Sequence, residues 1–304
     1  MERKKSISVV IPSFQESSAL EKHLPEVICV LERLHFSVQP IIINDLGQPD
    51  SSLEEICSGN HAALINTPWN MGSQQAILYG IRQQVSNFRS DIVLVMDGDG
   101  QDDADAIPDM INAVRPDRIV VAQRVGKRPE GLIFSSLYCI YKGLFRLLTG
   151  ITPDFGNFSA FDQSIADRIA ESSHFRFTYS MALPQLCSIQ RVPVKRLKRL
   201  TGESTLGYKG LFHHAVLSTL PYLDTIGARI MTGSLILLVI SIFLLICTLV
   251  LSMIFFECFI VPIPIALFSL IMTGFATQGV ILSLVILYSN SILKQIPACS
   301  EPYS

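Results

Sequence analysis

Apolar and polar positions alternate along the first 125 residues in a pattern that predicts a layered α/β domain. Continuous apolar runs typical of buried parallel strands lie at residues 7–14, 39–45, 62–67, 91–97 and 117–124. Between them, residues 17–35 and 72–88 carry apolar positions three and four residues apart, which is the spacing of amphipathic helices. This alternation of strands and helices predicts a doubly wound, mainly parallel, Rossmann-like sheet.

The pattern becomes less regular after residue 125. Residues 132–149 predict an amphipathic helix, residues 154–162 a loop with a short strand, and residues 190–200 a strand that carries basic side chains. Residues 211–228 form a weakly amphipathic segment broken by Pro221. We expect that segment to lie at a membrane surface.

Two long uncharged stretches follow, and they change the expected class of protein. No charged side chain occurs in residues 230–256, and after Glu257 none occurs until Lys294. A helix needs about 20 apolar residues to cross a bilayer. We therefore expect transmembrane helices near residues 230–255 and 265–288. The alternative is a buried helical hairpin in a soluble domain, which the length of both stretches disfavours.

Charges beside these stretches predict an orientation. Residues 191–209, just before the first span, contain six basic side chains and one acidic side chain. Basic residues beside a span mark its cytoplasmic side. Lys294, after the second span, predicts the same side, so Glu257 between the two spans should face outside the cell. The N-terminus lacks the apolar stretch of a signal peptide. We expect a multi-pass protein of the inner (plasma) membrane, with both termini in the cytoplasm. The expected parts are a cytoplasmic α/β domain (1–210), an amphipathic juxtamembrane segment (211–229), a transmembrane hairpin (230–293) and a cytoplasmic tail (294–304).

Composition limits the kinds of binding partner and cofactor to be expected. The net charge is −2 over 304 residues, so attraction of nucleic acid by the whole molecule is not expected. Seven cysteines are scattered without a CxxC pair, which argues against structural zinc and a disulfide framework. Small residues in the spans (Gly233, Gly274 and Gly279) would allow a homo-oligomer.

The segment VLVMDGDGQDD, residues 93–103, carries the clearest chemistry. An apolar run leads into Asp97, and single glycines then separate Asp97, Asp99 and Gln101. Alternate residues of an extended chain point to the same side. The three side chains can therefore converge on one hard cation through oxygen atoms.

The same segment also suits a solvated turn. We expect that structure for Asp102, Asp103 and Asp105, with Asp102 or Asp103 capping a helix that begins near Ala104. A solvated turn is less suitable for Asp97 and Asp99, because like charges at a buried strand end repel unless something neutralises them.

A second motif, NTPWNMGSQQAILYGI, spans residues 66–81 and places Gly72 at an expected loop-to-helix junction. A helix N-terminus attracts phosphate. The small residues Ala76 and Gly80 equally predict a helix packed tightly on the sheet. The motif alone leaves both interpretations open.

The segments VVIPSFQE, IIIND, NMGSQQA, VMDGDGQD and GEST occur here in an order and spacing that resemble the family 2 glycosyltransferases with a GT-A fold. The DFGNF segment and the two spans are similar to the branch that glycosylates polyprenyl phosphate. That branch includes bactoprenol glucosyltransferases, undecaprenyl-phosphate aminoarabinose transferases and dolichol-phosphate mannose synthases. The resemblance covers nearly the whole chain. It implies inverting transfer of a sugar from a nucleotide sugar, with a UDP-sugar favoured, to polyprenyl phosphate, with Mg²⁺ or Mn²⁺ as cofactor, for cell-surface glycan assembly or modification.

The resemblance also implies roles for individual residues. Those implied in nucleotide binding are Pro12, Glu16, Asp45, Gly72 and Asp97. Those implied in holding the metal are Asp97, Asp99 and Gln101. Those implied in catalysis are Asp99, Asp154 and Arg124. Those implied near the acceptor phosphate or on the adjoining loop are Arg124, Lys127, Arg128, Glu203 and Ser204.

Four positions depart from the family pattern. Asn44 and Leu46 replace the first aspartate and the glycine of the family's Asp-Asp-Gly-Ser after the second strand, Trp69 replaces an arginine, and Asn157 replaces an acid. The departures at Asn44, Leu46 and Asn157 motivate an alternative function, a non-catalytic membrane adaptor that keeps the GT-A fold. A processive synthase is disfavoured because the chain has no Gln-x-x-Arg-Trp motif.

Overall fold

The computed structural model describes residues 4–125, 132–195, 197–200, 208–254 and 262–295. Contacts divide the chain into two compact units. Among the described residues, one contains the chain up to Gly143 together with Ile151–Pro221, and the other contains Leu144–Gly150 and those of the range Tyr222–Pro297.

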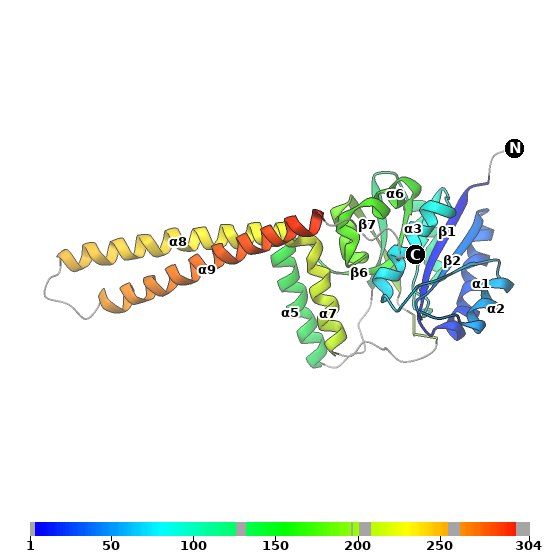
Figure 1. Ribbon diagram of the computed structural model, residues 1–304, viewed down its shortest axis with the longest axis horizontal. Helices are drawn as coiled ribbons and strands as arrows, with labels where there is room; N and C mark the ends of the chain where they lie inside the picture. Colours follow the sequence, from blue (N-terminus) through cyan, green and yellow to red (C-terminus); the bar gives the residue numbers. More distant parts are fainter. Residues whose placement is uncertain (1–3, 126–131, 196, 201–207, 255–261, 296–304) are drawn as a thin grey trace. The chain divides into compact units, whose positions relative to one another are not determined.

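The first unit is built on a seven-stranded sheet with the order β3-β2-β1-β4-β6-β5-β7 (Figure 1). Its strands are β1 (Ser6–Ser13), β2 (Ser37–Asn44), β3 (Ala63–Asn66), β4 (Ile92–Val95), β5 (Arg118–Val125), β6 (Phe155–Asp162) and β7 (Ser188–Lys195). All neighbours pair in parallel except β6, which runs antiparallel to β4 and β5. The predicted α/β class with a mainly parallel sheet is confirmed.

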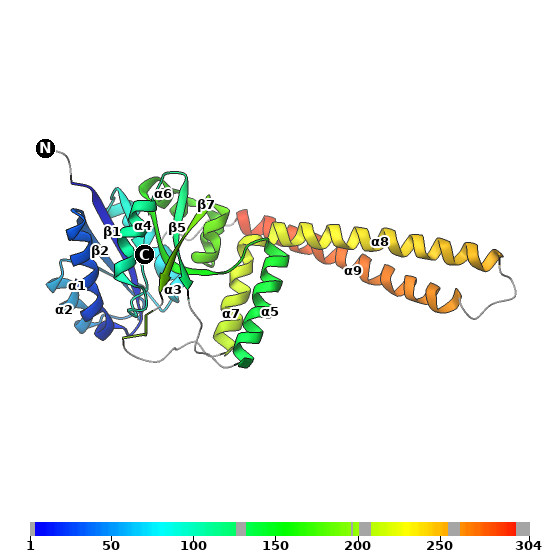
Figure 2. The same ribbon diagram turned by 180° about the vertical axis from the view of Figure 1, so that it is seen from behind.

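Helices cover both faces of this sheet (Figures 1 and 2). On one face, the odd-numbered side chains of β1 (Ile7, Val9 and Ile11) join a core with α1 (Ser17–Arg33), α2 (Ser51–Gly59) and α4 (Ile107–Ala113). On the other face lie α3 (Ser73–Asn87) and α6 (Gln163–Glu171). A Cβ atom built on Gly80 of α3 would lie 2.7 Å from Cγ1 of Val10, so α3 packs closely on the sheet. The remaining elements of the unit are η1 (Ala104–Ala106), the first part of α5 (Leu132–Thr149), η2 (Ser173–Arg176), η3 (Ser180–Gln185), α7 (Tyr208–Thr219) and the first residues of η4 (Leu220–Tyr222).

Three elements differ from the sequence-based expectation. Helix α2 was not predicted; it has nine residues, buries only Leu53 and Cys57, and is capped by Asp50, which accepts from the amides of the second and third helical residues. Strand β6 has eight residues, whereas a loop with a short strand was expected. Strand β7 ends at Lys195 and does not extend to residue 200 as expected.

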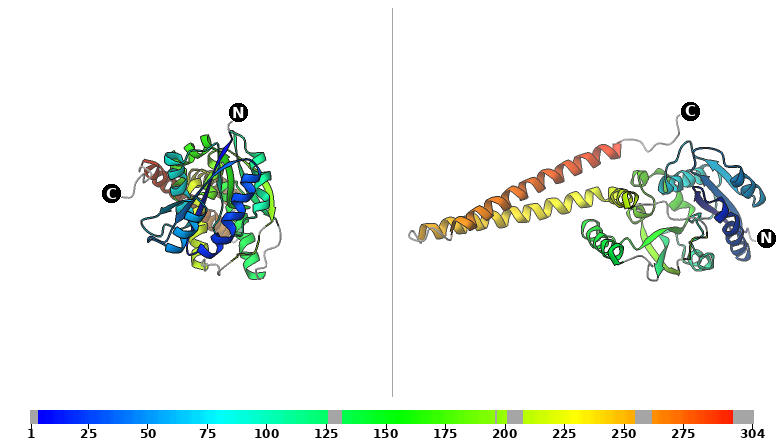
Figure 3. Two further views of the ribbon diagram at one scale, coloured as in Figure 1. Left: turned by 90° about the vertical axis from the view of Figure 1, so that its right-hand side faces the viewer. Right: turned by 90° about the horizontal axis from the view of Figure 1, so that it is seen from below.

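The second unit is dominated by α8 (Leu223–Ile254) and α9 (Pro262–Gln295), which lie side by side (Figures 1 and 3). Among the described residues, these are candidate membrane spans by length and composition. Large apolar side chains such as Phe243 and Leu282 are exposed along them, which is not expected of a core hairpin. Ser241 and Thr273 form a hydrogen bond of 3.0 Å between the two helices.

Candidate functional site

The acidic loop, residues 96–102, follows β4 at the edge of the sheet where the parallel strands end. It passes against the chain that leaves β1. A Cβ atom built on Gly98 would lie 2.7 Å from the carbonyl oxygen of Pro12 and 3.0 Å from Oε2 of Glu16. The structure therefore brings Pro12 and Glu16 to the acidic loop, and only a residue without a side chain fits between them.

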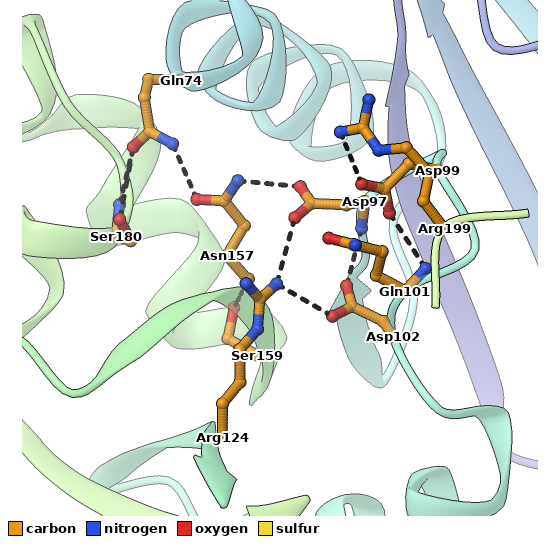
Figure 4. A network of polar contacts seen from close by, with 10 residues as sticks. All are labelled: Gln74, Asp97, Asp99, Gln101, Asp102, Arg124, Asn157, Ser159, Ser180 and Arg199. Atoms are coloured by element: carbon orange, nitrogen blue, oxygen red, sulfur yellow. Dashed lines mark hydrogen bonds and ion pairs between the residues drawn. The ribbon is translucent and has the colours of Figure 1, made fainter. Parts of the chain in front are cut away.

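Asp97 is held through both carboxylate oxygens (Figure 4). Its Oδ1 accepts a hydrogen bond of 2.8 Å from Nδ2 of Asn157, and its Oδ2 lies 3.6 Å from Nη2 of Arg124. Asn157 can reach Asp97 because β6 is antiparallel, so the first residues of β6 lie beside the last residues of β4 and β5.

A chain of two amides orients Asp97. Nε2 of Gln74 donates to Oδ1 of Asn157 at 2.7 Å. Oε1 of Gln74 accepts from the backbone N–H groups of Tyr179 and Ser180 at 2.9 and 3.2 Å. A backbone N–H can only donate. The orientation of Gln74 is therefore determined, and Asn157 must present its N–H to Asp97. We call this pair, Gln74 and Asn157, the amide chain.

Asp99 is also held through both oxygens, by residues from two segments. Its Oδ1 accepts from the backbone N–H of Gln101 at 3.0 Å, and its Oδ2 pairs with Nη2 of Arg199 at 2.9 Å (Figure 4). The backbone N–H groups of Leu197 and Leu200 donate to the carbonyl oxygens of Gln101 and Asp99 at 3.0 and 3.2 Å. The segment 197–200 therefore lies directly against the acidic loop.

Asp102 differs from the prediction of a solvated or capping residue. It is buried, its Oδ2 accepts from the backbone N–H of Asp97 at 2.9 Å, and its Oδ1 lies 3.4 Å from Nη2 of Arg124. Burial, followed by the charge of Asp97, raises the pKa of Asp102 to about 7. Asp103 is the capping residue, because its side chain accepts from the backbone N–H of Asp105 at the start of η1.

Glu16 lies beside the acidic loop, in the chain that follows β1. Burial, followed by the charge of Asp99, raises the pKa of Glu16 to about 7. Near neutral pH this carboxyl group therefore holds a proton for part of the time. Carboxyl groups with a pKa raised in this way occur often at functional sites.

The loops after β2 and β3 are connected through Asp45. Its Oδ1 accepts from the backbone N–H of Met71 at 2.7 Å and lies 3.3 Å from the hydroxyl of Thr67. Burial raises the pKa of Asp45 above its usual range. The same loop carries Trp69, which is 57% exposed, and leads to Gly72 at the N-cap of α3. A role of Asp45 and Gly72 in nucleotide binding stays a prediction.

Asp154 lies in a separate group of contacts. Its Oδ1 pairs with Nε of Arg191 at 3.0 Å, and its Oδ2 accepts from Nε2 of Gln123 at 2.8 Å. These contacts hold Asp154 to β7 and β5, and neither partner belongs to the acidic loop. The predicted loop residues Lys127, Arg128, Glu203 and Ser204 lie outside the described residues.

The side chains of the acidic loop offer the type of ligand atom that a hard divalent cation prefers. The carboxylates of Asp97 and Asp99 and the amide of Gln101 offer oxygen atoms. No group of three or more His, Cys, Asp or Glu side chains that could hold a metal occurs among the described residues. A cation here would therefore need the amide oxygen of Gln101 and oxygen atoms of a bound ligand. Guanidinium groups already lie beside the carboxylates of Asp97 and Asp99 and compensate their charge.

Three participants had no predicted role in the site. Gln74 lay in a motif that was considered for helix packing, phosphate binding and the family resemblance, but it had no role of its own. Asn157 appeared only as a departure, and Arg199 was counted only in a basic stretch. The one available signal was the replacement of an acid by Asn157, since an amide beside an aspartate can donate where an acid cannot.

Fold and site define a doubly wound α/β protein with an acidic, arginine-compensated loop where its parallel strands end. The profile of the family described as "Glycosyl transferase family 2" matches residues 8–177, which is more than half of the chain. The chain belongs to this family.

Two of the curated proteins that this chain is similar to have the same name. An undecaprenyl-phosphate 4-deoxy-4-formamido-L-arabinose transferase from Photorhabdus laumondii is 26% identical over 154 residues, covering 49% of this chain and 46% of that protein. The protein of the same name from Edwardsiella ictaluri is 24% identical over 215 residues, covering 68% of this chain and 65% of that protein. The matches thus span about half to two thirds of these relatives.

Solved structures share the fold. A mycobacterial protein superposes with a TM-score of 0.52 at 14% identity, covering 73% of this chain and 75% of that chain. Glucosyl-3-phosphoglycerate synthase from Mycobacterium tuberculosis, in complex with Mn²⁺, UDP-glucose and phosphoglyceric acid, superposes with a TM-score of 0.50 at 15% identity, covering 73% and 80% of the two chains.

Proposed function

We propose that this protein transfers a sugar, with inversion, from a nucleotide sugar to polyprenyl phosphate at the cytoplasmic face of the inner (plasma) membrane. The observation that carries the proposal is the acidic loop with Arg124 and Arg199 on its carboxylates, in a chain that continues into two candidate membrane spans. The names of the curated relatives support undecaprenyl phosphate as the acceptor. The product would serve cell-surface glycan assembly or modification.

A divalent cation, Mg²⁺ or Mn²⁺, is part of the proposal. Asp97, Asp99 and Gln101 would hold it, and when bound it would stabilise the negative charge that develops on the leaving diphosphate. The M. tuberculosis synthase, whose structure contains Mn²⁺ and UDP-glucose, supports this choice and a UDP-sugar as donor. The amide chain serves this site by holding Asp97 in one orientation.

The acceptor needs little help from a protein base. A phosphate monoester has a second pKa of about 6, so near pH 7 it is largely a dianion and can attack directly. One of its oxygen atoms forms the bond to the anomeric carbon while the bond to the diphosphate breaks on the opposite face. Arg124 is the proposed contact for the acceptor phosphate, because its guanidinium lies beside the acidic loop and is partly exposed.

The test is direct transfer by the full chain in membranes or detergent. Radiolabelled nucleotide sugars are incubated with undecaprenyl phosphate, with and without Mn²⁺, and lipid-linked sugar is measured. We expect metal-dependent product from at least one donor. We expect Asp99→Ala to reduce kcat/KM by roughly a hundredfold or more, because it removes a ligand whose cation is worth several kcal/mol. Asp105→Ala is the matched control, since that side chain is exposed beside the same loop.

The alternative is the non-catalytic adaptor. It would be supported if no donor gives lipid-linked sugar while nucleotide still binds. Full activity of Asp99→Ala would contradict the proposed role of the acidic loop.

A further inference from the structure

Arg199 lies on the carboxylate oxygen that a metal ion would need. We propose that Arg199 is the internal counter-cation of Asp99, and that a divalent cation binds this loop by displacing it. The inference rests on the proposed function and adds a mode of regulation to the same site, in which metal binding is an exchange of one cation for another.

The pair has the geometry of a strong contact. Nη2 of Arg199 lies 2.9 Å from Oδ2 of Asp99. The carboxylate side chain is 8% exposed and the arginine side chain 27%. A buried carboxylate without a partner is costly, so Arg199 stabilises the loop in the absence of a metal ion.

Backbone hydrogen bonds fix the position of the segment that carries Arg199. Leu197 and Leu200 donate backbone hydrogen bonds to Gln101 and Asp99, one on each side of Arg199. Gly100 has φ +72°, and a Cβ atom built on it would lie 2.5 Å from Cδ1 of Leu200. A glycine is therefore needed both for the turn and for the close approach of the segment 197–200.

Both oxygens of Asp99 are already in use. Oδ1 accepts from the backbone N–H of Gln101, and Oδ2 accepts from Arg199. A cation that shares Asp99 with Gln101 must take the place of the guanidinium, because two positive groups a few ångströms apart repel strongly away from bulk water. The measured affinity for the metal therefore includes the cost of breaking the ion pair.

This exchange would link the metal to the donor. A displaced guanidinium needs another anion, and the diphosphate of a nucleotide sugar brings one to the same loop. We therefore expect the cation to bind weakly alone and more tightly with nucleotide. By reciprocity, the metal tightens the nucleotide by the same factor.

The experiment measures Mn²⁺ binding directly. The full chain in detergent is titrated with Mn²⁺, and free metal is followed by electron paramagnetic resonance, without nucleotide and with saturating UDP. Arg199→Ala and Arg199→Gln remove the charge, and Arg199→Lys keeps it. Arg118→Ala is the matched control, because that arginine pairs with Asp117 at the exposed start of β5. Thermal unfolding confirms that each variant is folded.

Without nucleotide, we expect Arg199→Ala and Arg199→Gln to bind Mn²⁺ about three- to tenfold more tightly than the natural chain. Arg199→Lys should stay within about twofold, and Arg118→Ala should not change. UDP should tighten Mn²⁺ binding less in Arg199→Ala than in the natural chain. This result would not follow from a purely structural role of Arg199.

Two failures can be told apart. If Asp99→Asn abolishes Mn²⁺ binding but Arg199→Ala leaves it unchanged or weakens it, the exchange is wrong and the proposed function stands. If Asp99→Asn leaves Mn²⁺ binding intact, the cation site of the proposed function is itself wrong, and the exchange is overturned with it.

Discussion

Asp97 and Asp99 of the acidic loop share one arrangement of partners. In each, one oxygen accepts from an amide N–H and the other faces an arginine, with Asn157 and Arg124 on Asp97, and Gln101 and Arg199 on Asp99. The N–H groups set the direction of each carboxylate, and the arginines compensate its charge. The chain thus prepares the geometry of the loop before any ligand arrives.

The amide chain is testable at the scale of single residues. We expect Asn157→Ala to lower kcat/KM about tenfold or more, because it removes a hydrogen bond to a charged group. Gln74→Ala should do the same by freeing Asn157. The double variant should lose little more than either single variant, since both act through Asp97. Asn87→Ala, an exposed amide on the same helix as Gln74, is the control. Additive losses would show two independent roles.

Glu16 predicts a dependence of stability on pH. Its pKa rises from 4.5 to about 7 on folding, so between these values the folded protein holds a proton that the unfolded chain releases. The free energy of unfolding should therefore fall as pH rises through this range.

The substitution Glu16→Gln removes the contribution of this carboxyl group to the pH dependence of the free energy of unfolding. In EDTA, the variant should gain about 1 kcal/mol over the natural chain on going from pH 5 to pH 8, after allowance for partial exposure of the side chain, or roughly 2–4 °C in Tm. Glu21→Gln, exposed on the same helix, should keep the natural slope. An unchanged slope in Glu16→Gln would rule out this origin.

At the scale of elements, α3 packs closely on the sheet at Gly80. Cγ1 of Val10 and Cγ1 of Ile43 would lie 2.7 and 2.8 Å from a Cβ atom at Gly80. We expect Gly80→Val to destabilise the protein by about 1–3 kcal/mol through overpacking. Gly59→Val, at an open position on α2, should change stability by about 0.5 kcal/mol or less. Thermal unfolding compares the two, and equal effects would contradict tight packing of α3.

Sequence periodicity was sufficient for most elements and for the acidic loop. The strands and α1 and α3 follow from runs and spacings within a few residues. The helix α2 did not, because nine residues with two buried apolar side chains give a weak period. The contacts of Gln74 with Asn157 and of Asp99 with Arg199 join residues 83 and 100 positions apart. No local pattern contains such partners, so the fold was needed to reveal them.

At the scale of the whole molecule, the prediction concerns membrane topology. If α8 and α9 span the bilayer, the chain near Ser291 should face the cytoplasm and position 257 the outside. A cysteine-free protein with Glu257→Cys or Ser291→Cys is treated with a membrane-impermeant maleimide on intact spheroplasts. We expect labelling at 257 and none at 291 until the membrane is permeabilised. The reverse pattern would contradict a cytoplasmic acidic loop.

The hairpin has its own internal polar contacts. Asp224 accepts from Nδ2 of Asn290 at 2.7 Å and pairs with Lys294, while Ser241 and Thr273 bond further along. Such contacts between helices set their relative register and are worth about 0.6 kcal/mol each in membranes. Apolar length alone could predict the two helices, but it could not predict this register.

Trp69 gives the molecule an optical property. It is the only tryptophan in the chain and 57% exposed, on the loop that Asp45 holds through Met71. Indole emission shifts with contact to water, and excitation at wavelengths that tyrosine does not absorb limits the emission to this one known position. A spectrum of the intact protein is therefore a local signal from the loop after β3, free of contributions from any other tryptophan.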